Sequence, residues 1–289
     1  MCGRYALRRD IDDLVTEFEV DPMDAAARDA LAAGATRSTN VAPTTTPPVV
    51  LERVPRGRDG TVEDAPPTRQ LRALRWGLVP SWTKDAGEAT KGAARMINAR
   101  AESLLTKPAF AKAALTRRCL VPVDAWYEWQ VSPTVVEGGK PRKQPFAVRA
   151  TDGSVLSLGG VYEFWRDPAR PDDDPARWWV TFAVVTTAAE PGLDRLHERM
   201  PLVVPRDLRD AWLDPSLGER EDVEALLAAL PRDLFSAEAT GGPLLDAHPV
   251  PRRVGNVRVA DDGLLDPAPP AELDGAVDLR TGELLGTSA

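Results

Sequence analysis

The residue best placed to do chemistry in this chain is Cys2, directly after the initiator methionine. Methionine aminopeptidases remove Met1 when the second residue is small, so we expect the mature chain to begin with cysteine. Its α-amine, with a pKa of about 8, is partly neutral at pH 7, and its thiol is a strong nucleophile once ionised. Such a pair condenses with an aldehyde, first as a Schiff base and then as a five-membered thiazolidine. An incidental Cys2 is the alternative interpretation.

Three further polar residues could assist this chemistry. Glu128 lies between Tyr127 and Trp129 at the end of an apolar stretch, where burial would raise its pKa and let it donate a proton near neutrality. His197 is one of two histidines, and Asn98 follows two apolar residues. From the residues alone, a solvent-facing carboxylate, a structural histidine and a turn or cap asparagine stay open as alternatives.

Short motifs follow one another along the first 204 residues, with a weaker one near the end. They are MCGRYAL, NVAPTTTPPVV, RWGLVPSW, MINARAESL, RRCLVPVDAWYEWQ, HERMPLVV and HPVPRRVGNV. In these motifs and in their order, the chain resembles the SRAP (SOS response-associated peptidase) family, whose members crosslink to abasic sites in single-stranded DNA. The resemblance spans residues 2–204, and the full ordered set is far more specific than any single motif.

The resemblance implies a role for each matching residue. Cys2 is then the covalent nucleophile, Asn98 orients the adduct beside the N-terminal amine, and Glu128 opens the abasic sugar to its aldehyde. His197 assists proton transfer and reversal of the crosslink. The other implied DNA contacts are Gly3, the phosphate-binding Arg4, Arg100 and Arg199, and the channel-forming Asn40, Pro43, Trp76 and Trp82.

The charge of the chain is unevenly distributed. The net charge is −8, yet residues 69–118 hold eleven Lys and Arg against three Asp and Glu, a local net charge of +8. This basic segment also contains Trp76 and Trp82, and basic residues interleaved with aromatic ones are typical of single-strand binding. The alternative is an exposed face whose charge is merely uneven.

Composition excludes several classes of protein. Two cysteines and two histidines, without CxxC or HxxxH spacing, rule out a disulfide framework and predict neither a metal nor another cofactor. No apolar run approaches the roughly 20 residues of a membrane helix, and the start of the chain does not resemble a signal peptide. We therefore expect a cytoplasmic protein that joins the nucleoid at damaged DNA. Because no heptad repeat or long apolar stripe is present, we expect a monomer.

The elements that must position these residues are strands separated by polar loops. Periodicity predicts helices over residues 10–20, 24–33, 109–118, 205–213 and 220–230. It predicts strands over residues 48–54, 71–79, 119–129, 145–150, 154–165, 178–187 and 248–259. The main loops are predicted over residues 55–69, 83–94, 132–144 and 166–177.

This pattern predicts one α+β domain of SRAP type over residues 2–259. We expect a largely antiparallel, barrel-like β core with peripheral helices. The Pro- and Asp-rich residues 260–289 show little periodicity and are expected to form a mostly disordered tail.

Four functions follow as hypotheses from different classes. The first is a DNA-repair protein that joins Cys2 to an abasic site in single-stranded DNA and shields the site from strand cleavage. The second is a thiol peptidase, acting at least on the bond after Met1. The third is an N-terminal-nucleophile amidohydrolase, a class that includes enzymes with the same Met-Cys-Gly start. The fourth is a non-covalent single-strand-binding module. The ordered motifs favour the first.

Overall fold

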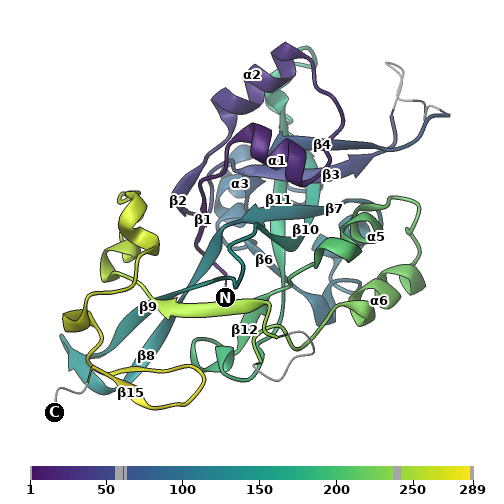
Figure 1. Ribbon diagram of the computed structural model, residues 1–289. Coiled ribbons are helices and arrows are strands. Elements are labelled where there is room, and N and C mark those ends of the chain that lie inside the picture. Colours follow the sequence, from purple (N-terminus) through teal and green to yellow (C-terminus); the bar gives the residue numbers. More distant parts are fainter. Residues whose placement is uncertain (1, 56–60, 62–63, 237–241, 287–289) are drawn as a thin grey trace.

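The computed structural model describes residues 2–55, 61, 64–236 and 242–286, which form an α+β fold on two sheets (Figure 1). The five-stranded sheet has the order β13-β9-β8-β1-β2. Its strands are β1 (Tyr5–Leu7), β2 (Ser38–Val41), β8 (Ala125–Glu137), β9 (Lys140–Ala150) and β13 (Leu245–Pro249). All its strand pairs are antiparallel.

The second sheet has eight strands, in the order β12-β11-β10-β7-β3-β4, and β5 and β6 also pair with β11. Its strands are β3 (Pro48–Arg53), β4 (Thr68–Ala73), β5 (Arg75–Trp76), β6 (Asn98–Arg100), β7 (Arg118–Val123), β10 (Leu156–Arg166), β11 (Trp178–Ala188) and β12 (Arg199–Pro201). The pairs of β11 with β5 and β6 are parallel. The predicted α+β class and largely antiparallel sheets are confirmed, but neither sheet closes into a barrel.

The five predicted helices are all present, and their bounds are α1 (Ile11–Glu17), α2 (Ala25–Gly34), α4 (Pro108–Thr116), α5 (Arg209–Leu213) and α6 (Arg220–Ala229). In the view of Figure 1, α1 and α2 lie at the top and α5 and α6 at the right. Among the described residues, no helix combines the length and apolar content that a bilayer crossing needs.

The predicted loop over residues 83–94 is wrong, because α3 (Ala86–Ala93) occupies most of it. The Asp85 side chain accepts a hydrogen bond from the Glu88 N–H at the start of this helix. Ala89 and Ala93 are buried against Trp165. The two buried residues are alanines, so the apolar face of this helix gives only a weak signal in the sequence.

Two further predictions need correction around residue 124. The predicted strand over residues 119–129 is two strands, β7 and β8, which belong to different sheets. The chain changes sheet at Asp124, whose carboxylate accepts hydrogen bonds from the Arg8 N–H (2.7 Å) and Arg9 Nε (2.9 Å). The predicted loop over residues 132–144 is instead the end of a hairpin of β8 and β9 that turns at Gly138 and Gly139.

The end of the chain also differs from the sequence-based expectation. Residues 260–286 are ordered and include the β14 (Ala276–Val277) and β15 (Leu284–Leu285) pair. Leu264 and Leu279 are buried, and the Gln130 amide exchanges two hydrogen bonds with the backbone of Val277. A few widely spaced apolar residues dock this segment, which is why no periodicity reveals it. Residues 287–289 of the tail and residues 56–60 and 62–63 of the predicted loop lie outside the described residues.

The hydrophobic core joins the two sheets around the start of the chain. The main cluster takes in Cys2 and Tyr5 from the N-terminus, Trp126 from β8, and Cys119 and Phe182 from the eight-stranded sheet. A smaller cluster covers the other face of the five-stranded sheet, where Tyr127 packs with Val254 and other residues of the C-terminal part. The N-terminal residues are therefore enclosed between the sheets.

Candidate active site at the N-terminus

Cys2 is fully buried three residues before the start of β1, in the core between the two sheets. On one side, β1 runs antiparallel to β8, with Tyr5 opposite Trp126. On the other side, Asn98 at the start of β6 donates a hydrogen bond from its Nδ2 to the Cys2 carbonyl oxygen (2.8 Å). Asn98 therefore fixes the backbone of the proposed nucleophile.

Glu128 lies next to Cys2 because side chains alternate between the two faces of β8. Trp126 and Glu128 share the face that looks toward the main core, while Tyr127 points to the opposite face. Burial leaves Glu128 only 6% exposed and raises the pKa of its carboxyl group. The pKa of the Cys2 thiol is also raised, first by burial and then by the negative charge of Glu128. The two side chains therefore interact electrostatically.

His197 reaches the same region from the segment that leads into β12. Its Nδ1 accepts a hydrogen bond from the Arg199 N–H (3.0 Å), which assigns the proton of the neutral ring to Nε2. Burial lowers the pKa of His197. The imidazole is therefore neutral at physiological pH.

The guanidinium of Arg199 is engaged in contacts within the protein and is not free to bind a phosphate. Its guanidinium makes a bidentate pair with Glu102 (2.9 and 2.8 Å) and donates to the Thr186 carbonyl oxygen (2.6 Å). The sequence-based phosphate role for Arg199 is thus at odds with its contacts. Arg100 is exposed on β6 and, by strand alternation, shares the face of Asn98. It stays available to a phosphate.

Arg4 and Asn40 meet on the outer side of the five-stranded sheet. Arg4 donates to Asn40 Oδ1 (2.8 Å) and to the Val254 carbonyl oxygen (3.0 Å), and its guanidinium lies over the Trp129 ring. Asn40 is 5% exposed, and its Nδ2 donates to three carbonyl oxygens, those of Val254, Asn256 and Val259. Asn40 therefore ties β2 to the C-terminal part of the chain and does not line an open channel.

The two tryptophans that were expected to stack on bases have different environments. Trp76 is fully buried, donates from Nε1 to the Ile97 carbonyl oxygen, and packs against Tyr5 and Phe182. It presents no free ring face, so the stacking role predicted for it is wrong. Trp82 is 61% exposed in the turn that follows β5 and can receive a base.

Two predicted contacts remain, Gly3 and Pro43, and two residues without a predicted role, Trp129 and Arg232, make side-chain contacts of their own. Gly3 and Pro43 are half-buried, Gly3 between Cys2 and Arg4 and Pro43 in the turn after β2. Sequence analysis assigned no role to Trp129 or Arg232. The ring of Trp129 lies under the guanidinium of Arg4. In the sequence, the only sign of a role for Trp129 is its position beside Glu128. Arg232 donates to Thr187 Oγ1 (2.6 Å), a contact with no sequence signal.

The described residues contain no group of three His, Cys, Asp or Glu side chains that could hold a metal ion. The candidate site therefore consists of a thiol, a carboxyl group, an amide and an imidazole at the start of the chain. These groups can exchange protons and hold a small electrophile.

This fold and site define an α+β protein with a buried cysteine at its N-terminus. The profile of the SOS response associated peptidase (SRAP) family matches residues 1–257, and the chain belongs to this family. It is 30% identical over 241 residues to the abasic site processing protein YoqW of Bacillus subtilis, covering 83% of this chain and 91% of the relative. It is 28% identical to the abasic site processing protein HMCES of Mus musculus, covering 80% of this chain and 65% of that one.

A solved structure supports the fold. The crystal structure of a protein from Bacteroides thetaiotaomicron matches with a TM-score of 0.69 and 21% identity, covering 93% of this chain and all of the other.

Proposed function

We propose that this protein senses abasic sites in single-stranded DNA and joins to them covalently through Cys2, after removal of Met1. The observation that carries the proposal is the burial of Glu128 beside Cys2 while Asn98 holds the Cys2 carbonyl oxygen (2.8 Å). The relatives named abasic site processing proteins support the choice of substrate.

The chemistry is a condensation that releases one water. The α-amine of Cys2 adds to the C1′ aldehyde of the ring-opened sugar, and loss of water from the resulting carbinolamine gives an imine. The thiol sulfur then bonds to the imine carbon while its proton passes to the nitrogen, which closes the thiazolidine ring. No oxidant, reductant or metal enters this balance.

Glu128 and His197 supply the protons that these steps need. Because burial raises its pKa, Glu128 keeps a proton to higher pH than an ordinary carboxyl group and can donate it when the sugar ring opens. His197 stays neutral and, with the proton on Nε2, can transfer a proton when the adduct forms or reverses. The bound strand would contact the exposed Trp82 and Arg100.

The thiol peptidase is the second candidate. Burial raises the pKa of the Cys2 thiol, whereas a thiol peptidase requires an environment that favours the thiolate. Self-processing at Met1 stays testable: Met1 retained in Glu128→Ala but absent in the wild type, as measured by intact mass, would support it.

The deciding experiment mixes the protein with a single-stranded oligonucleotide that holds one abasic site. We expect a band that survives heat and denaturant, with the mass of the protein from Cys2 onward plus DNA minus one water. Cys2→Ala should abolish it. Cys119→Ala is the matched control, because Cys119 is the other fully buried cysteine and lies in β7.

Two outcomes would redirect the assignment. A wild-type protein that has lost Met1 and still gives no adduct would contradict the crosslinking proposal. Equal DNA affinity in the wild type and Cys2→Ala, without any covalent product, would instead support a non-covalent binding module. Glutaminase activity would point to an amidohydrolase.

A further inference from the structure

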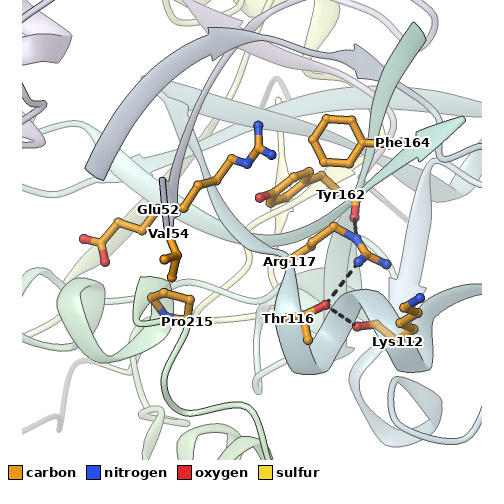
Figure 2. Close-up of a pocket in the computed structure, with 9 residues that line it drawn as sticks. Glu52, Val54, Lys112, Thr116, Arg117, Tyr162, Phe164 and Pro215 are labelled. Atoms are coloured by element: carbon orange, nitrogen blue, oxygen red, sulfur yellow. Dashed lines mark hydrogen bonds between the residues drawn. The ribbon is translucent and has the colours of Figure 1, made fainter. Parts of the chain in front are cut away.

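A cavity lies along β10, away from the Cys2 site. It has a volume of about 490 Å³, and its lining residues are Glu52, Arg53, Val54, Lys112, Thr116, Arg117, Tyr162, Phe164 and Pro215 (Figure 2). Phe164 pairs with Val180 on β11, whereas Asn98 pairs with Val184 on the same strand. The volume lies within the range of small-molecule sites.

The charges around this cavity are unbalanced toward the positive. Glu52 in the lining pairs with Arg69 (2.6 Å), and Arg117 in the lining pairs with the neighbouring Glu163 (2.7 Å). Within the described part of the chain, Arg53 and Lys112 have no carboxylate partner. The Arg53 guanidinium instead lies over the ring of Phe164, 5.0 Å from its centre.

A third cation, Arg72, is close enough to Arg53 for the two charges to repel each other, although it does not line the cavity. Arg72 on β4 lies on the same face as Arg53 on β3, as the pairing of Val49 with Arg72 and of Arg53 with Thr68 requires. Burial lowers the pKa of Arg72, and the charge of Arg53 lowers it further. Like charges that are partly removed from water cost free energy, which a bound anion would offset.

The floor of the cavity offers a hydroxyl donor. Tyr162 is 1% exposed, and among the described residues its hydroxyl makes no hydrogen bond. Figure 2 shows this hydroxyl directed toward the side of the cavity on which Glu52 and Val54 lie. Burial raises the pKa of Tyr162 to about 12, so the group keeps its proton and can donate it to an anion.

We propose that this cavity binds a phosphate monoester of nucleotide size. Arg53 and Lys112 contact the phosphate, and Tyr162 donates a hydrogen bond to it. Two cations without a carboxylate partner among the described residues, together with a hydroxyl donor, line one cavity, and they match the three terminal oxygens of a phosphate dianion better than the two of a carboxylate. The same chemistry occurs in a free nucleotide and at the 5′-phosphate end of a DNA strand.

Calorimetric titration of the full-length protein tests the proposal with four probes. These are thymidine 5′-monophosphate, thymidine, and one abasic-free oligonucleotide with and without a 5′-phosphate. We expect thymidine 5′-monophosphate to bind and thymidine not to bind. Stronger binding of the 5′-phosphorylated oligonucleotide over its unphosphorylated form would identify a strand end as a source. Equal binding of the two oligonucleotides would indicate that the phosphate monoester comes from a free nucleotide.

Three variants link the binding to the cavity. Arg53→Gln and Lys112→Gln should each weaken binding of thymidine 5′-monophosphate, by about tenfold for Arg53→Gln, the size expected for a charged hydrogen bond. Lys112 is exposed, so its variant keeps the fold. Lys91→Gln, an exposed lysine on α3, is the matched control and should bind as the wild type does.

The proposal is independent of crosslinking, because Cys2→Ala should bind thymidine 5′-monophosphate unchanged. Two results would overturn it. One is the absence of phosphate-dependent binding of any probe at millimolar concentration. The other is an affinity for thymidine 5′-monophosphate that is unchanged in both Arg53→Gln and Lys112→Gln.

Discussion

The carboxyl group of Glu128 is buried beside Cys2, and its raised pKa makes a prediction about pH. A general acid must be protonated, so the rate of adduct formation should fall as pH rises through this pKa. Because burial raises the pKa, the fall occurs at higher pH than for an ordinary carboxyl group. Glu128→Gln should slow the reaction by about 10²-fold and remove this pH dependence.

Timed gels of the abasic-site adduct between about pH 5 and 9 measure both effects, with initial rates compared at each pH. A variant that retains the pH profile of the wild type would assign the titration to another group.

The amide of Asn98 positions the N-terminus through a single donated hydrogen bond. Asn98→Asp keeps the shape of the side chain but removes the donor and places a carboxylate against the Cys2 carbonyl oxygen. We expect the adduct rate to fall by about tenfold, the equivalent of one hydrogen bond, together with a lower melting temperature.

The matched control is Asn256→Asp, at a residue whose side chain accepts a hydrogen bond from the Arg258 N–H, a role that aspartate keeps. An adduct rate unchanged in Asn98→Asp would show that this contact does not orient the nucleophile.

Trp82 is the exposed aromatic residue within the basic segment. Trp82→Ala should weaken binding to intact single-stranded DNA by about 1–3 kcal/mol, the contribution of one stacked base. Fluorescence anisotropy with a labelled oligonucleotide measures the change. Trp178→Ala is the control, since Trp178 is also half exposed but lies outside that segment. Equal losses in the two variants would contradict a specific role for Trp82.

Individual site residues were predictable to different degrees. Cys2, Asn98 and Glu128 do lie together, as the resemblance to the family implies. Trp76 illustrates the limit: a tryptophan beside arginines looks like a stacking surface until the strand shows which face it buries. Asn40 illustrates another, since its three carbonyl partners are more than 200 residues away in the sequence.

At the scale of elements, α3 depends on its first turn. Asp85→Ala removes the side chain that accepts the Glu88 N–H and should cost about 1 kcal/mol of the free energy of unfolding. Asp85→Asn keeps a capping acceptor and should cost much less. Urea denaturation of the three proteins gives the comparison, and equal stability of Asp85→Ala and the wild type would show that the cap contributes nothing.

Elements with a strong apolar period were predictable, and those that depend on distant partners were not. The apolar spacing of α1 and the β-rich runs of β10 and β11 match the predicted ranges closely. Strands β8 and β9 continue to pair with each other where they extend beyond the core. The residues there are polar and exposed, so the sequence carries no apolar pattern at the end of this hairpin. The change of sheet at Asp124 depends on tertiary contacts. The sequence does not show it, because the residues on both sides of Asp124 form one nearly continuous apolar run.

At the scale of the whole molecule, the ordered segment 260–286 makes the fold depend on its C-terminal part. Truncation after Val259 should expose surface that Leu264 and Leu279 now cover and leave the amide of Gln130 without the Val277 backbone. Burial of one leucine contributes about 1.5–3 kcal/mol, so we expect a loss of more than about 3 kcal/mol in the free energy of unfolding.

Guanidinium denaturation of the full-length and shortened proteins measures this loss. Equal stability of the two proteins would instead support the boundary at residue 259 that the sequence predicts.

The enclosure of Cys2 between the sheets has a consequence for the timing of synthesis. Cys2 leaves the ribosome almost first, whereas the strands that enclose it, β6 and β8, are translated about one hundred residues later. In the finished fold Cys2 has no exposed surface for an aminopeptidase to reach. Under the proposed function, we therefore expect Met1 to be removed during translation, and a tag fused before Cys2 to prevent adduct formation.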